Sequence, residues 1–210
     1  MTATAALAQQ HPGQGPLVVS SYAPGEVTFL LTDLSDLALE LGVTEREQAI
    51  QAGRNYAEML PVEYAPGQRY LDLFEAGLTA SAPSLAEQVG VVTEMVLAAR
   101  GPGAVLVSLA RAGTPVGILM RRWAQQIHGL DLPHYSVSIV RGVGIDHAAL
   151  DLIAARHDPA KVVFVDGWTG KGAIVQELQQ ALASYPTAAF PADLAVLADP
   201  GACASFFGTR

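Results

Sequence analysis

The chain has 210 residues, of which 50% are hydrophobic and 15% are charged, and its formal net charge is −8. This length and apolar content are enough for one α/β domain with a substantial core. The acidic balance disfavours nucleic-acid binding as a function, although a local basic pocket for a phosphorylated small molecule is compatible with it. No apolar run approaches the ~20 residues of a membrane span, so a membrane partner is not expected.

The N-terminal part of the chain differs in composition from the rest. Residues 1–16 are rich in Ala, Gln, Gly and Pro and lack the basic and apolar regions of a signal peptide, so we expect a disordered tail. We expect 17–84 to form a hood or lid region and 85–210 to form an α/β core. Within the hood, 53–70 holds three tyrosines beside two prolines. This segment reads equally as a lid over a site and as a surface loop fixed by its tyrosines.

Hydrophobic patterns predict the remaining elements in chain order. An apolar element begins at 27–31, and Thr44 with Glu47 forms a capping box for a helix over 45–52. The patterns then predict helices at 71–77, 84–100, 116–127, 147–157 and 173–184, and strands at 104–109, 134–140, 162–165 and 194–197.

The stretch 161–174, KVVFVDGWTGKGAI, is the most informative part of the chain. Its buried strand ends on a carboxylate, Asp166, and a glycine-rich turn leads into a helix. In open parallel sheets ligands bind at the carboxyl ends of strands, and such a turn leaves N–H groups free for an anion. Thr169 adds a hydroxyl and Lys171 a positive charge. The stretch predicts a phosphosugar or nucleotide site, and the alternative is a plain strand–turn–helix.

The glycines of this turn fit neither of two common phosphate motifs. Only two residues separate Gly167 from Gly170, and Gly172 rather than Ser or Thr follows the lysine, so the P-loop pattern fails. The dinucleotide pattern G-x-G-x-x-G fails as well. An anion site here is therefore of another kind.

A second segment, 104–117, repeats the plan of strand, polar glycine turn and helix. Arg111 follows the strand, Gly113 permits close approach of a ligand, and Pro115 suits the first turn of a helix. The alternative for Arg111 is a side chain that reaches into solvent.

Together the two loops resemble those of type I phosphoribosyltransferases, which hold the 5-phosphate and the pyrophosphate of phosphoribosyl pyrophosphate. The segment 162–172 is similar to the 5-phosphate loop, and 108–117, SLARAGTPVG, is similar to the pyrophosphate loop. More closely, strings such as VTFLL-DL, SLARAGTPVG, FVDGWTGKGAI and LADPG-C across 27–210 resemble the phosphoribosyltransferase-like family of tellurium-resistance and stress operons. Members of that family are also labelled StiP-type cysteine proteases. The resemblance implies an α/β fold with an open, mainly parallel sheet flanked by helices.

The resemblance also implies a reaction and roles for residues. The reaction is a Mg2+-dependent transfer of a phosphoribosyl group to a small-molecule acceptor that the sequence does not identify. Mg2+ would arrive on the pyrophosphate, without a direct protein ligand, and Asp166 and Asp146 would meet the ribose and the shell of the metal. Arg111, Asp166 and Arg141 would be catalytic. The binding residues would be Thr169, Gly170, Lys171 and Gly172 for the 5-phosphate, and Ser108, Arg111, Ala112 and Gly113 for the pyrophosphate.

Location and assembly follow from less specific features. The single cysteine, Cys203, rules out an internal disulfide framework and favours the reducing cytoplasm. Type I relatives are often homodimers, so a homodimer is one expected state, and the sequence itself leaves the oligomeric state open.

Two alternative functions follow, one from a departure from the general family pattern and one from the cysteine-protease label. Gly167 stands where the general family has a second acid, which motivates a non-catalytic phosphoribosyl or nucleotide sensor on the same fold. A cysteine peptidase would use Cys203 as its nucleophile and would need a base in reach. The candidate bases are His128, His134, His147 and His157.

Overall fold

The computed structural model describes residues 20–33, 37, 39–54, 59–110 and 112–210. The chain falls into two compact units, of which one contains the residues up to Thr32 together with Pro83–Arg210 and the other contains Asp33–Ala82. The predicted tail, Tyr56 of the hood and Arg111 lie outside the described residues. Within the described residues, no helix is both long enough and apolar enough to cross a membrane.

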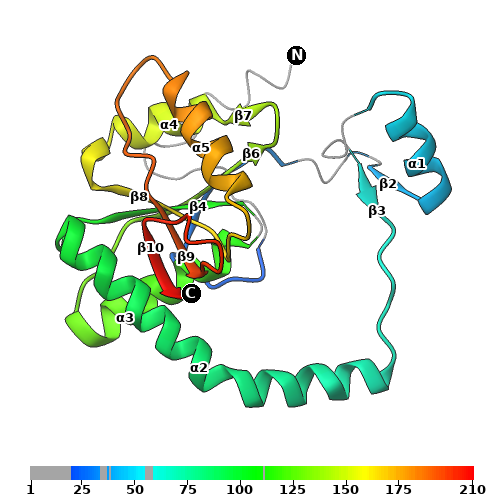
Figure 1. The fold of residues 1–210 in the computed structure, drawn as a ribbon, viewed down its shortest axis with the longest axis horizontal. Coiled ribbons are helices and arrows are strands. Elements are labelled where there is room, and N and C mark those ends of the chain that lie inside the picture. The colour runs from blue at the N-terminus through cyan, green and yellow to red at the C-terminus, as the bar shows by residue number, and fades with distance from the viewer. Residues whose placement is uncertain (1–19, 34–36, 38, 55–58, 111) are drawn as a thin grey trace. The chain divides into compact units, whose positions relative to one another are not determined.

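The larger unit is built on a six-stranded parallel sheet with the strand order β1-β5-β4-β8-β9-β10 (Figure 1). Runs of β-branched and aromatic residues form its central strands, and every residue of β4 and β8 is buried. The predicted α/β fold with an open, mainly parallel sheet is therefore confirmed. The strands of this sheet are β1 (Thr28–Leu30), β4 (Val105–Leu109), β5 (His134–Val137), β8 (Val162–Val165), β9 (Leu194–Ala198) and β10 (Phe206–Thr209).

Helices cover both faces of this sheet, as Figure 1 shows. Strand residues such as Val107 and Phe164 pack against α4 and α5, whereas their neighbours Leu106 and Val163 pack against α3 and the carboxyl half of α2. This alternation follows from the two-residue period of a strand. With both faces covered, we expect a ligand at the carboxyl ends of the strands. The helices are α1 (Val43–Gln51), α2 (Gln68–Arg100), α3 (Gly113–His128), α4 (His147–Ala154) and α5 (Ala173–Ala183), with a 3-10 helix at Pro159–Lys161.

Two predicted helices are a single helix in the structure. Residues 71–77 and 84–100 both belong to α2, which runs through Pro83. A proline inside a helix removes one backbone hydrogen bond, but good helix formers on both sides keep the helix continuous here. The prediction of two separate helices was wrong.

Three further boundaries differ from the sequence pattern. Helix α1 begins after Gly42, whose N–H donates to the Glu45 carboxylate at 3.2 Å, so Thr44 is not the capping residue. The predicted strand at 134–140 is two strands, β5 and β6 (Ile139–Val140), and β6 pairs with β7 (Gly144–Ile145) in an antiparallel hairpin. The C-terminal phenylalanines, which the pattern assigned to no element, form β10 beside β9.

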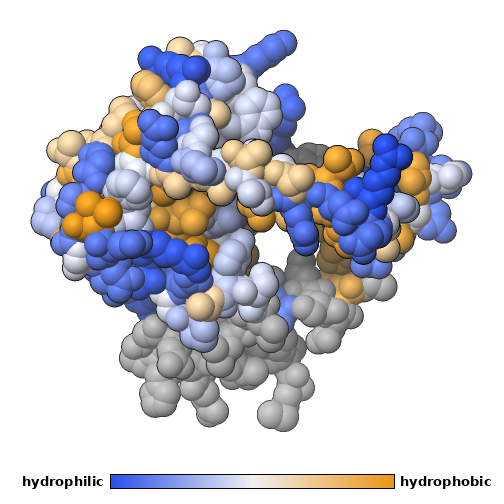
Figure 2. Space-filling view, turned by 90° about the horizontal axis from the view of Figure 1, so that it is seen from below, coloured by the Kyte–Doolittle hydropathy of each residue, from blue (hydrophilic) through white to orange (hydrophobic). Residues whose placement is uncertain are grey.

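The smaller unit contains α1, the amino part of α2, and a two-stranded parallel sheet of β2 (Glu40–Leu41) and β3 (Leu60–Pro61). Several of its large apolar side chains are exposed, among them Val43 and Tyr64. Figure 2 shows one face of the protein, with apolar residues in orange interrupting the hydrophilic surface. The role of this unit as a hood stays a prediction.

Candidate functional site

The strand order creates a switch point between β4 and β8. From β4 the chain passes through α3 to β5 on one side, and it later reaches β8 on the other side. The loops that follow β4 and β8 therefore leave the sheet toward different sides, and the carboxyl ends of two such strands are where an open α/β sheet binds its ligand in a crevice. These are the two loops that the sequence pattern singled out.

The two loops are in direct contact. A Cβ added to Gly113, the first residue of α3, would lie 2.2 Å from the carbonyl oxygen of Val165 at the end of β8. In the other loop, a Cβ added to Gly167 would lie 3.0 Å from the Cβ of Ala112. Glycine at these positions therefore lets the two backbones approach each other. The N-terminus of α3 is thereby placed beside the loop that leads into α5.

Thr169 is the most informative residue of the β8–α5 loop. Its side chain is only 2% exposed, and its hydroxyl has no hydrogen-bond partner among the described residues. Its backbone N–H donates to Ala198 of β9 at 3.1 Å, so the loop is fixed to the sheet. A buried hydroxyl without a partner is uncommon and costs free energy, so Thr169 is a candidate for contact with a ligand.

The rest of this loop prepares the N-terminus of α5. Gly172 precedes the helix with φ of +79°, a left-handed conformation that suits glycine, and is itself buried. The first N–H groups of a helix have no partner within the helix, and its dipole favours an anion there. Lys171 is exposed beside this N-terminus and supplies a positive charge.

Asp166 is the carboxylate that follows β8. Its Oδ1 accepts a hydrogen bond from the N–H of Gly167 at 2.8 Å. Burial raises the pKa of Asp166, and the bond from Gly167 only partly offsets this effect. A carboxylate in a desolvated crevice is a frequent feature of functional sites.

A third loop, after β9, joins the site. A Cβ added to Gly201 would lie 1.8 Å from the carbonyl oxygen of Gly170, so this loop packs against the β8–α5 loop. Asp199 is fully buried and shapes the turn, because its carboxylate accepts the N–H groups of Cys203 at 2.8 Å and Ala204 at 3.2 Å. The predictions did not include Asp199. The signal was the Asp-Pro-Gly sequence directly after an apolar strand.

Two predicted ligand residues have hydrogen-bond partners within the protein, and their ligand contacts stay predictions. Ser108 is fully buried, and its hydroxyl lies 2.8 Å from Gly113 O and 2.7 Å from His134 Nε2. Asp146 caps α4, since its Oδ1 accepts the N–H groups of Ala148 and Ala149. The partners of Ser108 come from tertiary packing, which the sequence pattern does not show. The capping role of Asp146 was readable from the sequence, because Asp directly before the predicted helix 147–157 is a preferred N-cap residue.

Arg141 and Arg111 are the predicted cations of the site. Arg141 is exposed in the turn between β6 and β7, where the N–H of Gly142 donates to Glu177 of α5 at 3.1 Å. This contact ties the turn to the helix whose N-terminus lines the crevice. Arg111 lies outside the described residues, so its role stays a prediction.

Cys203 lies against the β8–α5 loop without a histidine bonded to it. Its Sγ donates to Gly201 O at 3.1 Å. Each candidate base is engaged elsewhere, and within the described part of the chain no hydrogen bond joins any of them to Cys203. The partners are Glu94 for His128, Ser108 and the Glu26 carbonyl for His134, Tyr185 for His147 and Tyr135 for His157.

A family model described as "Tellurite-like stress resistance cysteine protease StiP" matches residues 20–210. The chain belongs to this family. It is 42% identical over 190 residues to the cysteine protease StiP of Acinetobacter baylyi, covering 88% of this chain and 48% of that protein. The chain thus spans about half the length of this curated relative.

The chain is also similar to solved phosphoribosyltransferases at low identity. A xanthine-guanine-hypoxanthine phosphoribosyltransferase of Helicobacter pylori is 17% identical, with a TM-score of 0.40 over 57% of this chain and 75% of that one. The hypoxanthine phosphoribosyltransferase of Trypanosoma cruzi is 15% identical, with a TM-score of 0.42 over 60% of this chain and 77% of that one. The site described above rests on the strand order and loop contacts themselves.

Proposed function

We propose that the crevice between β4 and β8 binds phosphoribosyl pyrophosphate and that the protein transfers its phosphoribosyl group to an acceptor. The observation that carries the proposal is the buried, unpartnered hydroxyl of Thr169. This hydroxyl lies in a loop that opens α5, where N–H groups and a lysine favour an anion. A phosphate oxygen would accept its hydrogen and remove the cost of leaving it unpaired.

The two loops would divide the substrate between them. The 5-phosphate would bind Thr169, Lys171 and the N–H groups at the start of α5. The pyrophosphate would lie at the start of α3, where Ala112 and Gly113 contact the end of β8. Binding the 5-phosphate and the pyrophosphate together would fix C1 of the ribose between them. This positioning would lower the entropy cost of reaching the transition state. Arg111 is the cation that we expect on the leaving pyrophosphate.

The chemistry is a displacement at C1. The acceptor nucleophile forms a bond to C1 while the C1–O bond breaks, and the electron pair of that bond leaves with pyrophosphate. Mg2+ carried by the pyrophosphate would supply positive charge against the negative charge of the leaving group. Asp166, with its raised pKa, is the carboxylate placed to meet the ribose hydroxyls or the water shell of that ion. Among the described residues, no group of three His, Cys, Asp or Glu side chains could hold a metal directly.

The glycine at position 167 has a packing reason. A side chain there would begin 3.0 Å from the Cβ of Ala112, which is closer than side chains usually approach. A second acid at this position would therefore require Ala112 to shift by a few tenths of an ångström. Gly167 thus permits the close approach of the two loops, and it leaves Asp166 as the single carboxylate of this turn. The alternative of a non-catalytic sensor still has a basis, because one acid offers fewer oxygens to the ribose hydroxyls than the two acids of the general family.

Isothermal titration with phosphoribosyl pyrophosphate and Mg2+ tests binding, with Lys171→Gln as the variant. Loss of a charge-assisted hydrogen bond should weaken binding by about 10- to 100-fold. The control is Lys161→Gln, since Lys161 precedes the amino end of β8, away from the crevice, and bonds the carbonyl of Arg100. No binding by the unmodified protein, or equal binding by both variants, would overturn the proposal. Binding without pyrophosphate release across a panel of acceptors would favour the sensor.

A cysteine peptidase is the second candidate, and the family description together with the position of Cys203 favours it. The thiol lies against Gly172 of the proposed phosphate loop, but the described histidines have other partners. A peptidase would therefore need a rearrangement, or a base from outside the described residues. Peptide hydrolysis that is lost in Cys203→Ser and kept in Lys171→Gln would establish this function over the first.

A further inference from the structure

The loop 199–204, which follows β9, packs against the proposed phosphate loop, 169–172. A Cβ added to Gly201 would lie 1.8 Å from the carbonyl oxygen of Gly170, and one added to Gly172 would lie 3.0 Å from the sulfur of Cys203. The two loops therefore touch at two points, and neither point leaves room for another side chain. The position of the phosphate loop thus depends on where loop 199–204 lies.

Asp199 holds loop 199–204 through hydrogen bonds to its backbone. Its Oδ1 accepts the N–H of Cys203 at 2.8 Å, and its Oδ2 accepts the N–H of Ala204 at 3.2 Å. Its carbonyl oxygen also accepts the N–H of Ala202 at 3.1 Å. Because the donors are backbone N–H groups and the side-chain acceptor is a carboxylate, no two acceptors compete for one hydrogen.

The turn that these bonds close has a strained backbone. Ala202 has φ of +52°, in the left-handed region that residues other than glycine rarely adopt. Such a conformation costs free energy and persists where the surrounding structure holds it. The N–H groups of Ala202 and of the residue after it both donate to Asp199, so Asp199 holds this turn.

Arg210 supplies the charge opposite Asp199. Its Nε donates to Oδ2 at 3.3 Å, and its Cζ lies 3.9 Å from the centre of the Phe207 ring. Phe207 belongs to β10, and the N–H of Asp199 donates to the carbonyl of Thr209 in the same strand at 2.9 Å. Loop 199–204 and β10 are therefore both bonded to Asp199.

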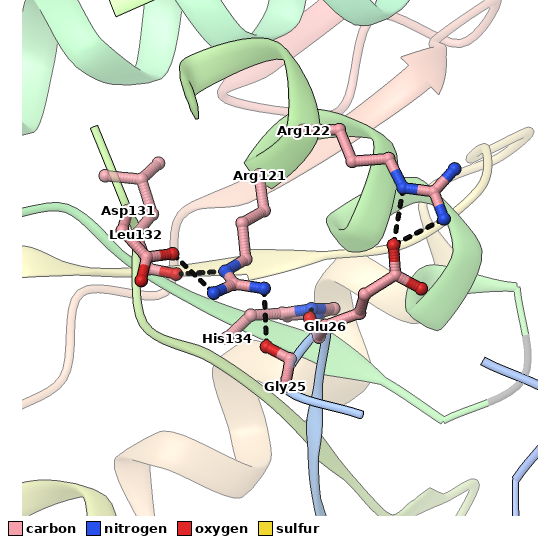
Figure 3. A network of polar contacts seen from close by, with 7 residues as sticks. All are labelled: Gly25, Glu26, Arg121, Arg122, Asp131, Leu132 and His134. Carbon is pink, nitrogen blue, oxygen red and sulfur yellow. Dashed lines mark hydrogen bonds and ion pairs between the residues drawn. The ribbon is translucent and has the colours of Figure 1, made fainter. Parts of the chain in front are cut away.

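The burial of Asp199 distinguishes it from the acids of other ion pairs. Figure 3 shows two such pairs, in which Arg121 bonds Asp131 and Arg122 bonds Glu26, and the side chains of these acids are 66% and 15% exposed. The side chain of Asp199 is 0% exposed. Water can therefore replace a lost partner of Asp131 but not one of Asp199, and a buried polar group without a partner costs free energy.

We propose that Asp199 is a positioning residue that acts through Gly201 and Cys203 to hold the phosphate loop in its ligand-binding arrangement. The proposal rests on the proposed function for its ligand, phosphoribosyl pyrophosphate. Without the bonds to Asp199, the turn at Ala202 is free to leave its strained conformation, and the phosphate loop loses its support. The binding-competent arrangement is then less populated, and the apparent affinity falls by that fraction.

Asp199→Asn is the test variant, because it keeps the size of the side chain and replaces one acceptor oxygen by an NH2 group. In either orientation of the amide, this NH2 group faces the N–H of Cys203 or that of Ala204, so one of the two bonds is lost. If Asp199→Asn does not fold, Cys203→Ala takes its place, since it removes the sulfur that packs on Gly172 and keeps the backbone bonds.

Asp193→Asn is the matched control, because Asp193 and Asp199 flank opposite ends of β9. Asp193 also pairs with an arginine, Arg100, whose guanidinium lies over a phenylalanine ring, that of Phe206. The control therefore removes the same kind of charge pair at the amino end of the strand, away from the phosphate loop.

The first measurement is the dissociation constant of phosphoribosyl pyrophosphate with Mg2+, by titration calorimetry. Loss of one hydrogen bond should raise it about three- to tenfold in Asp199→Asn, and Asp193→Asn should stay within about twofold of the parent protein. In the parent protein the ligand should slow amide hydrogen exchange at Cys203 and Ala204, because coupling between two sites is reciprocal. Equal affinity in Asp199→Asn and the parent, equal weakening in both variants, or no slowing by bound ligand overturns the proposal.

A second measurement needs no ligand, so it decides the proposal even if the parent protein binds no phosphoribosyl pyrophosphate. Amide hydrogen exchange at Thr169 and Gln176 reports on the phosphate loop, because their N–H groups donate to the carbonyls of Ala198 at 3.1 Å and Gly172 at 3.0 Å. Both N–H groups thus have a bond to lose. Both exchange rates should be about three- to tenfold higher in the test variant than in the control variant.

The ligand-free result also separates this proposal from the proposed function. Faster exchange at Cys203 and Ala204 with unchanged exchange at Thr169 and Gln176 would show that loop 199–204 moves without the phosphate loop, and it would overturn the positioning role. If all four rates rise and the parent protein binds no phosphoribosyl pyrophosphate, the proposed function fails, whereas the support of the phosphate loop by Asp199 stands.

Discussion

The sulfur of Cys203 packs directly on Gly172. A Cβ added to Gly172 would lie 3.0 Å from that sulfur and 3.3 Å from the Cβ of Cys203. Gly172 also has φ of +79°, where side chains are strained. Two separate constraints thus require glycine at the point where the proposed phosphate loop enters α5.

Replacing Gly172 should therefore lower the free energy of unfolding by more than the strain of its backbone angle alone would. Gly129→Ala is the matched control, because Gly129 also has a left-handed φ, +68°, but open space around its Cα. The control should lower the free energy of unfolding by about 1–2 kcal/mol, and Gly172→Ala by roughly 1 kcal/mol more. Urea unfolding measures both. Adding Cys203→Ala should recover part of the extra loss for Gly172→Ala and none for Gly129→Ala; equal effects on both would show that the sulfur contact is unimportant.

The contact between the two loops should be the most sensitive point of the site. In Gly113→Ala the new methyl group would overlap the Val165 carbonyl, a backbone atom that cannot turn away. We expect a loss of about 3 kcal/mol or more in the free energy of unfolding, together with loss of phosphoribosyl pyrophosphate binding. Gly103→Ala, in open space before β4, should change both by little. Thermal unfolding and titration calorimetry compare the pair.

The elements near these loops were predictable, because strands β4 and β8 are unbroken apolar runs and the turns after them are glycine-rich. Their contact was not predictable. The approach of Gly113 to Val165 depends on β8 lying beside β4, and the order of strands in a sheet is set by long-range packing. The sequence pattern therefore located both loops without showing that they meet.

Residue types alone did not reveal the hydrogen-bond partners of Ser108, His134 and Asp199. Ser108 and His134 face each other across neighbouring strands, from positions 26 residues apart, and neither residue type alone signals that pairing. Asp199 satisfies backbone N–H groups in its own turn, which a pattern of residue types shows only as an Asp-Pro-Gly sequence. The helices predicted at 71–77 and 84–100 are one helix, because the rest of α2 favours the helical state strongly enough to continue through Pro83.

The stability of the protein should fall in acid through His134. Burial is the main cause that lowers its pKa from 6.5 to about 4; the charge of Arg121 acts in the same direction, and the bond to the Glu26 carbonyl opposes it. Because the unfolded chain takes up the proton first, stability is fully present above pH 6.5 and is lost as the pH falls toward 4. The difference is on the order of 3 kcal/mol.

Urea unfolding between pH 7 and pH 4 measures this dependence. His134→Asn removes the titrating group, so its stability should decline less over that range than that of the parent protein. His157→Gln serves as the comparison, because the pKa of His157 is also lowered by burial but its ring is far less enclosed. If the free energy of unfolding falls equally with pH in the parent and in His134→Asn, the buried histidine does not cause the loss of stability in acid.

The most direct test of the central claim compares Thr169→Val with Thr114→Val. Both remove a buried hydroxyl, but that of Thr114 bonds Ser136 at 2.8 Å, whereas that of Thr169 has no partner among the described residues. Without ligand, Thr169→Val should keep or raise the free energy of unfolding, by up to about 1 kcal/mol, and Thr114→Val should lower it by about 1 kcal/mol. With phosphoribosyl pyrophosphate and Mg2+, calorimetry should show binding weakened about tenfold by Thr169→Val. A Thr169→Val protein that binds phosphoribosyl pyrophosphate as tightly as the parent would contradict the phosphate site.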